Sequence, residues 1–217
     1  MSLSEHKRGF TIIELLVVCS IIAVLATVVV MNYKNSKITV RNAKRVQDLS
    51  DVRSALDLYK ESNGSYPLTT AGSPPSGAGS MRSECNGWGP FTIENVIPGL
   101  IPSYLSSLPK DALFSTQPTG AGYIPNNDDK YCYIYTSNST DYAFMLHYAN
   151  SGSVTSEVNW LSRPELVDPA RSCGGQSGST FTACHSASSC NDGSWTIPTN
   201  NAQIHAWKIY SEGGKCW

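Results

Sequence analysis

The sequence predicts an α+β fold, in which a long N-terminal α-helix packs on a small antiparallel β-sheet head with a loop-rich, disulfide-bonded C-terminal region. Three observations predict this fold. Residues 10–63 contain no Gly and no Pro, the residues that most weaken a helix interior. Residues 131–136 and 142–148 are rich in aromatic and aliphatic side chains and flank a short polar turn, as hairpin strands do. Six of the seven cysteines lie beyond residue 84.

These elements divide the chain into three expected parts: a leader of residues 1–9, a helix of residues 10–63 and an exported globular head of residues 64–217. A chain of 217 residues is long enough for one ordinary domain plus an appendage. The formal net charge is −1, so the basic bias typical of nucleic-acid binding is missing. We therefore expect no nucleic-acid partner.

The first half of the expected helix is apolar. Residues 10–31 carry one formal charge, Glu14, and at about 1.5 Å per residue they rise roughly 33 Å, enough to cross a bilayer core. Lys7 and Arg8 precede them, which favours a cytoplasmic N-terminus and an exported C-terminus. A carboxylate within a membrane segment costs on the order of 2.5–3.5 kcal/mol. Glu14 is therefore expected to have a function and a partner.

Two other kinds of membrane segment share part of this pattern. A cleaved secretory signal has a shorter apolar core, of about 7–15 residues, that ends in an A-x-A-like site. The nearest candidate here, between Ala23 and Ala26, has the wrong spacing. A plain single-pass anchor fits the length but does not account for Glu14.

The second half of the helix is expected to be amphipathic and to pack one face on the head. Its apolar residues recur at steps of three and four; they are Val46, Leu49, Val52, Leu56 and Tyr59. Lys44 and Asp48 form an opposite-charge i,i+4 pair that is expected on a remaining face. Asn63-Gly64, with Pro67 just beyond, predicts the end of the helix.

The head is expected to begin with loops and to continue with strands. Residues 64–125 are rich in Gly and Pro, with one apolar stretch, residues 93–108, that is expected to form a broken helix. In the hairpin that follows, alternation places Cys132 and Ile134 on one face and Tyr131, Tyr133 and Tyr135 on the other. A run near residues 203–210 is expected to add another strand.

Six cysteines form the expected disulfide framework of the head: Cys85, Cys132, Cys173, Cys184, Cys190 and Cys216. An even number in an exported, polar region is typical of an oxidising compartment. Six cysteines allow fifteen pairings; local geometry favours Cys85 with Cys132, Cys173 with Cys184, and Cys190 with Cys216. Their spacing matches no zinc pattern, so we expect no metal and no cofactor.

The N-terminal residues carry a motif with a specific resemblance. Lys7-Arg8-Gly9 is followed by Phe10-Thr-Ile-Ile-Glu14, which resembles the prepilin signature of type IV pilins and the pseudopilins of type II secretion. The resemblance implies that a prepilin peptidase and methylase cuts after Gly9 and N-methylates Phe10. It also implies that the Glu14 carboxylate neutralises the ammonium at Phe10 of a neighbouring copy, since each charge is costly alone in lipid.

Two later stretches extend the resemblance. Residues 55–67 are similar to the end of the long helix in major pseudopilins and related pilins, and residues 100–111 resemble a later stretch of that family. The sequence departs from the family in three places. Its apolar helix lacks a proline, Ala112 follows Asp111 where pseudopilins tend to have Pro, and no calcium loop is recognisable.

The function expected from these features is that of a structural subunit in an extracellular type IV pilus-like filament, or fimbrium, including a role in cell adhesion. The resemblance implies copies of the chain, an inner-membrane assembly platform and the lipid bilayer as partners, with the precursor in the inner membrane. A periplasmic pseudopilin of type II secretion and a membrane-anchored glycan-binding ectodomain are the alternatives. No nucleophile–base pair suggests catalysis, so we do not expect an enzyme.

Overall fold

The computed structural model describes residues 11–69, 81–84, 91–114, 132–147, 160–169, 206–215 and 217. Its contacts divide the chain into two units, Met1–Arg41 and Asn42–Trp217. One helix, α1 (Ile12–Asn63), contributes to both. It ends where Gly64 adopts a φ of +78°, a left-handed conformation that closes many helices.

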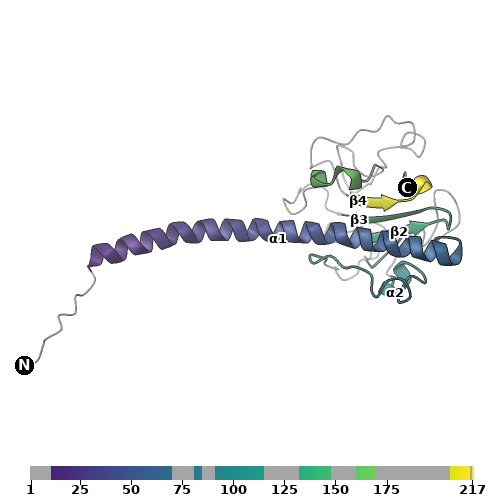
Figure 1. The fold of residues 1–217 in the computed structure, drawn as a ribbon, viewed down its shortest axis with the longest axis horizontal. Helices are drawn as coiled ribbons and strands as arrows, with labels where there is room; N and C mark the ends of the chain where they lie inside the picture. Colours follow the sequence, from purple (N-terminus) through teal and green to yellow (C-terminus); the bar gives the residue numbers. More distant parts are fainter. Residues whose placement is uncertain are drawn as a thin grey trace, which may run out of the picture. The chain divides into compact units, whose positions relative to one another are not determined.

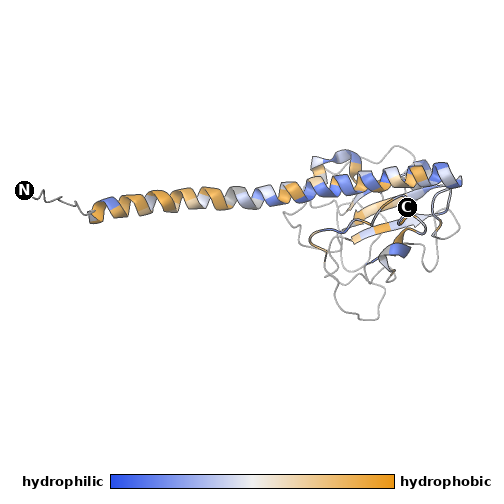
Figure 2. Ribbon diagram, turned by 60° about the horizontal axis from the view of Figure 1, so that its bottom comes forward, coloured by the Kyte–Doolittle hydropathy of each residue, from blue (hydrophilic) through white to orange (hydrophobic). Residues whose placement is uncertain are grey.

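The first unit contains the apolar half of α1. Figure 2 shows this half as almost uniformly hydrophobic and the second half as mixed. By length and composition α1 is able to cross a membrane.

The second unit contains the polar half of α1 and a small antiparallel sheet. The described strands are β1 (Arg82–Ser83), β2 (Cys132–Ser137), β3 (Tyr142–His147) and β4 (Ala206–Tyr210). Their order in the sheet is β1-β2-β3-β4, and every neighbouring pair is antiparallel. The predicted helix and antiparallel sheet are thus confirmed, and Figure 1 shows the strands beside α1.

Each face of the sheet packs against a different part of the chain. The face toward α1 carries Tyr133, Phe144 and Trp207, in one cluster with Leu49 and Leu56 of the helix. The opposite face forms a second cluster, whose buried members are Cys132, Ile134, Ala143, Met145 and Trp217. The predicted alternation along β2 is confirmed, because Cys132 and Ile134 lie in one cluster and Tyr133 and Tyr135 in the other.

The short elements depart from the sequence-based expectation. The helix expected over residues 93–108 is only α2 (Ile93–Val96). Pro98 and Gly99 follow it, and Gly99 has a φ of +72°, a conformation that a right-handed helix cannot include. The remaining described elements are single 3₁₀ turns: η2 (Trp160–Ser162), η3 (Pro164–Leu166) and η5 (Glu212–Gly214).

Three tyrosines of the head are expected to make its stability sensitive to alkaline pH. Burial raises the pKa of Tyr133, Tyr135 and Tyr142 above the usual value of 10.0, and the nearby Asp48 carboxylate adds to the effect at Tyr133. A raised folded-state pKa means that the unfolded chain loses these protons first. Stability is therefore fully present below about pH 10 and falls as pH rises further, by on the order of 4 kcal/mol at pH 11 for the three groups together.

Urea unfolding of the detergent-solubilised chain between pH 8 and pH 11 measures this loss. In the Tyr142→Phe variant the slope of unfolding free energy against pH above about pH 10 should be shallower by up to about 1.4 kcal/mol per pH unit, because one buried tyrosine that resists deprotonation is gone. Equal slopes in the two chains would show that Tyr142 does not contribute.

Candidate assembly site at the N-terminal helix

The start of α1 is held by reciprocal hydrogen bonds between Thr11 and Glu14. The backbone N–H and the hydroxyl of Thr11 both donate to Glu14 Oε2 at 2.8 Å. The backbone N–H of Glu14 donates in return to Thr11 Oγ1 at 3.2 Å. This is a capping box, in which side chains satisfy N–H groups that the first helical turn leaves without partners.

The capping box fixes a carboxylate at the N-terminal end of an apolar helix. Glu14 is exposed, and the hydrogen bonds described for it use Oε2. The helix macrodipole also favours a negative charge at this end. The arrangement therefore presents an oriented anion that is suited to binding a cation. Gly9 and Phe10, the predicted processing residues, lie outside the described part of the chain.

The apolar side chains that follow are open to their surroundings. The Ile, Leu and Val side chains from Ile12 to Val30 have between 51% and 85% of their surface accessible. Ser20 Oγ donates to the Val17 carbonyl and Thr27 Oγ1 to the Val24 carbonyl, both at 2.7 Å. Such internal bonds satisfy hydroxyls without water, as lipid requires. Cys19 in this stretch is an exposed free thiol.

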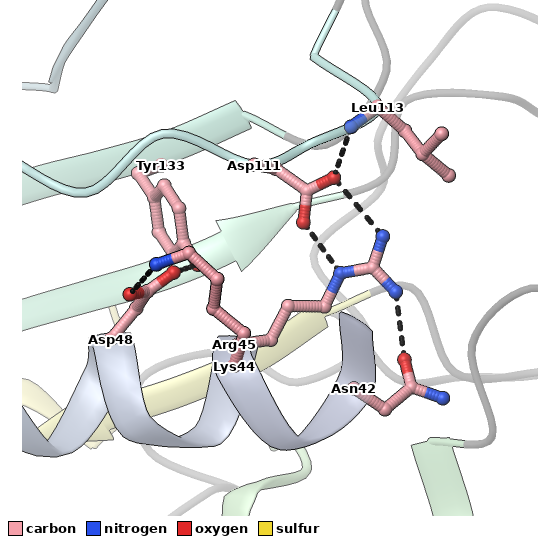
Figure 3. Close-up of polar contacts among 7 residues, drawn as sticks. All are labelled: Asn42, Lys44, Arg45, Asp48, Asp111, Leu113 and Tyr133. Carbon is pink, nitrogen blue, oxygen red and sulfur yellow. Dashed lines mark hydrogen bonds and ion pairs between the residues drawn. The ribbon is translucent and has the colours of Figure 1, made fainter. Parts of the chain in front are cut away.

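A buried ion pair joins the head half of α1 to a later loop (Figure 3). Arg45 Nε lies 2.5 Å from Asp111 Oδ2 and Arg45 Nη2 lies 3.1 Å from Oδ1, so the contact is bidentate. Arg45 Nη1 also donates to Asn42 Oδ1 at 2.7 Å, and the Leu113 N–H donates to Asp111 Oδ1 at 2.8 Å. The side chains of Arg45 and Asp111 are only 1% and 2% exposed. The pair therefore fixes the loop to the helix with its charges out of water.

A second polar contact under α1 differs from the expectation. Lys44 pairs with Asp48 as predicted, at 2.8 Å, but Asp48 does not lie on an exposed face. Its side chain is 7% exposed and accepts a hydrogen bond from the Tyr133 hydroxyl of β2 at 2.9 Å (Figure 3). Asp48 thus links the helix to the sheet.

A third ion pair lies at β4. Lys208 Nζ is 2.6 Å from Asp168 Oδ1, and both side chains are 0% exposed. The same ammonium donates to backbone oxygens of Lys215 and Trp217 at 2.8 and 3.3 Å. Beside it the Asp168 N–H donates to the Ala206 carbonyl at 3.1 Å, and Val167 bridges to Trp207. We call these contacts between residues 167–168 and 206–208 the neck.

Among the head cysteines, only Cys132 falls within the described residues. It is 1% exposed. The other five predicted disulfide residues, Cys85, Cys173, Cys184, Cys190 and Cys216, lie outside the described part of the chain. In the part of the chain that the structure describes, no group of three or more His, Cys, Asp or Glu side chains is placed to hold a metal ion.

Comparison with known proteins places the exposed N-terminal helix in a family. The prokaryotic N-terminal methylation motif matches residues 6–30. The type II secretion system core protein G of Escherichia coli K12 is 42% identical over 72 residues, which cover 33% of this chain and 50% of that protein. The N-terminal part of the chain thus carries a prepilin-type methylation motif and is homologous to type II secretion pseudopilins. Pilins and pseudopilins are structural proteins, which agrees with the expectation that the chain is not an enzyme.

Other relatives agree over a similar extent. The type II secretion system core protein G of Pectobacterium carotovorum is 44% identical over 67 residues, covering 31% of the pilin-like chain and 43% of the relative. The Vibrio cholerae protein of that name is 38% identical over 72 residues, covering 33% and 49%. The chain thus spans about half the length of the curated relatives it matches. No solved structure matches it significantly.

The sequence contains a local signal for the cap at the start of α1, in addition to the charge of Glu14. Thr11-Ile-Ile-Glu14 fits the [ST]-x-x-[DE] pattern of a capping box before an apolar run. No such local signal exists for the ion pairs of the head. Arg45 and its partner Asp111 are distant in the sequence, and so are Lys208 and its partner Asp168.

Proposed function

We propose that the chain is the structural subunit of a type IV pilus-like filament, assembled through α1 after a prepilin peptidase removes residues 1–9. The observation that carries the proposal is the oriented Glu14 carboxylate at the start of an exposed apolar helix. Cutting after Gly9 creates an ammonium at Phe10. In lipid, the carboxylate of one copy and the ammonium of the next are each costly alone and compensated together, which favours assembly in one register.

Processing gives the direct test of this proposal. The mature chain isolated from its native host is expected to begin at Phe10 with an N-methyl group, which intact mass and N-terminal sequencing detect together. Before the cut, the precursor is expected in the inner membrane with its N-terminus in the cytoplasm. A mature chain that begins at Met1, or beyond Ala26, would contradict the proposal.

A secretion pseudopilus is a second candidate for the same assembly, and a specific observation favours it. The relatives reported above are named type II secretion system core protein G, and their similarity includes 31% to 33% of this chain. An adhesive pilus is favoured instead by the large remainder of the head, which those matches do not cover. Fibres that extend from cells expressing this subunit and its assembly platform would support a pilus, and fibres retained below an outer membrane would support a pseudopilus.

The disulfide framework of the head is part of the proposal. Export places the six head cysteines in an oxidising compartment, and a bridge that restricts the unfolded chain typically contributes about 2–4 kcal/mol. We expect three disulfides, with Cys132 paired to Cys85, Cys173 to Cys184 and Cys190 to Cys216. Non-reducing peptide mass mapping tests both statements. Free thiols at these positions would contradict the framework, and a different set of crosslinked peptides would contradict only the pairing.

A further inference from the structure

The far end of the apolar segment carries a pair of side chains that the proposed assembly does not use. Tyr33 is 60% exposed, and Lys37, one helical turn later, is exposed as well. The Lys37 ammonium lies 4.3 Å from the centroid of the Tyr33 ring. Both residues belong to the first unit of the chain. At this point the helix surface changes from aliphatic to aromatic and cationic.

These side chains fit the chemistry of a lipid headgroup layer. A tyrosine ring has an apolar body and a polar tip, and such rings gather where hydrocarbon meets water. A lysine lays its stem on apolar surface and keeps its ammonium among the phosphates. The contact between the two side chains holds the cation over the ring face. The ring and the ammonium would therefore lie together at the membrane surface.

The length of the helix gives this pair a consequence at the other end. Glu14 precedes Tyr33 by a distance along α1 of about 28 Å at a rise of about 1.5 Å per residue. The hydrocarbon core of a bilayer is about 30 Å thick. If Tyr33 lies at the outer boundary of that core, Glu14 lies at its inner boundary, next to the cytoplasmic headgroups, and not at the midplane.

We propose that Tyr33 and Lys37 bind the outer lipid headgroup layer and set the depth at which α1 of the precursor lies in the bilayer. Before assembly, the Glu14 carboxylate then lies at the inner edge of the bilayer. The inference rests on the proposed function, because it concerns the precursor before assembly. At the inner edge the carboxylate is solvated by headgroups and by its own cap from Thr11. The charge is then carried into hydrocarbon only when a neighbouring copy supplies the compensating ammonium.

The test uses the full-length precursor with Tyr33→Trp, reconstituted at low density in phosphatidylethanolamine and phosphatidylglycerol vesicles. The lipids carry bromine either near the ester carbonyls or near the chain ends, and emission of the chain without the substitution is subtracted. Quenching by bromine near the carbonyls should be about twofold stronger than by bromine near the chain ends, because the ring lies at the boundary. When the chain also carries Lys37→Ala, quenching by bromine near the chain ends should increase relative to quenching by bromine near the carbonyls.

A matched control lies in the head. Lys60 stacks on Tyr66 with its ammonium 4.4 Å from the ring centroid, so Lys60→Ala removes the same kind of pair away from the apolar segment and should leave the quenching at position 33 unchanged. Absence of quenching by either lipid would overturn the proposal, as would quenching that Lys37→Ala does not alter. The N-terminus of the mature chain is read separately: a start at Phe10 with no quenching refutes the depth anchor alone, and quenching with an unprocessed N-terminus refutes the filament function alone.

Discussion

Glu14→Gln is expected to lower filament yield at least about tenfold while membrane insertion and head folding stay normal. Glutamine keeps the shape of glutamate and an oxygen that accepts from Thr11, but it removes the charge. The ammonium at Phe10 of the neighbouring copy would then enter lipid without an anionic partner. Charges at the centre of a membrane helix cost on the order of 2.5–3.5 kcal/mol, and about 1.4 kcal/mol is already a tenfold change in an equilibrium.

The measurement is the amount of subunit in sheared and sedimented fibres relative to the amount in the membrane. Glu14→Ala removes the cap as well as the charge, so its further loss relative to Glu14→Gln reports the contribution of the capping box, about 0.5–2 kcal/mol. Glu61→Gln removes an exposed carboxylate near the end of the same helix and should leave yield unchanged. Normal yield from Glu14→Gln would refute the charge-pairing mechanism.

Asp111→Asn is expected to destabilise the head by about 3–5 kcal/mol, because it leaves the Arg45 guanidinium buried without its carboxylate. Such a loss is a large fraction of the stability of an ordinary domain, about 5–15 kcal/mol. Urea unfolding of the detergent-solubilised chain at neutral pH measures the effect.

A double variant separates the ion pair from the packing around it. Arg45→Met with Asp111→Leu replaces both charges with apolar side chains, a change that is often close to neutral in buried pairs, so most of the lost stability should return. Asp51→Asn is the control, since Asp51 is exposed and accepts from Gln47 at 2.7 Å; it should change stability by less than about 0.5 kcal/mol. A loss for Asp111→Asn no larger than that of the control would show that the pair does not hold the loop.

Local sequence patterns predicted the larger elements of this fold. The step of three and four along Leu49, Val52 and Leu56 identified the buried face of α1, because a helix presents one face at that period. Alternation along β2 identified both faces of the sheet for the same kind of reason. The strand β1 has two residues, too few for any periodic signal, and was not predicted.

The polar contacts of the head were not predictable, because their partners are distant in sequence. Arg45 and Asp111 are 66 residues apart, and Asp48 and Tyr133 are 85 apart. From the sequence alone a charged residue is expected to face water. Asp48 was accordingly placed on an exposed face, and only the position of β2 explains why its carboxylate is buried. At the N-terminal end the reverse holds, since Thr11 and Glu14 are neighbours in sequence and their contact was readable from it.

The neck has a consequence for how substitutions in the head are tolerated. The chain leaves the described head after Pro169 and returns at Ala206, and the neck holds these two points together through Asp168 and Lys208. Both side chains are 0% exposed, so replacing one of them with a neutral residue would leave the other as a buried charge without its opposite charge. The two charged side chains that join the ends of this segment therefore cannot be exchanged singly.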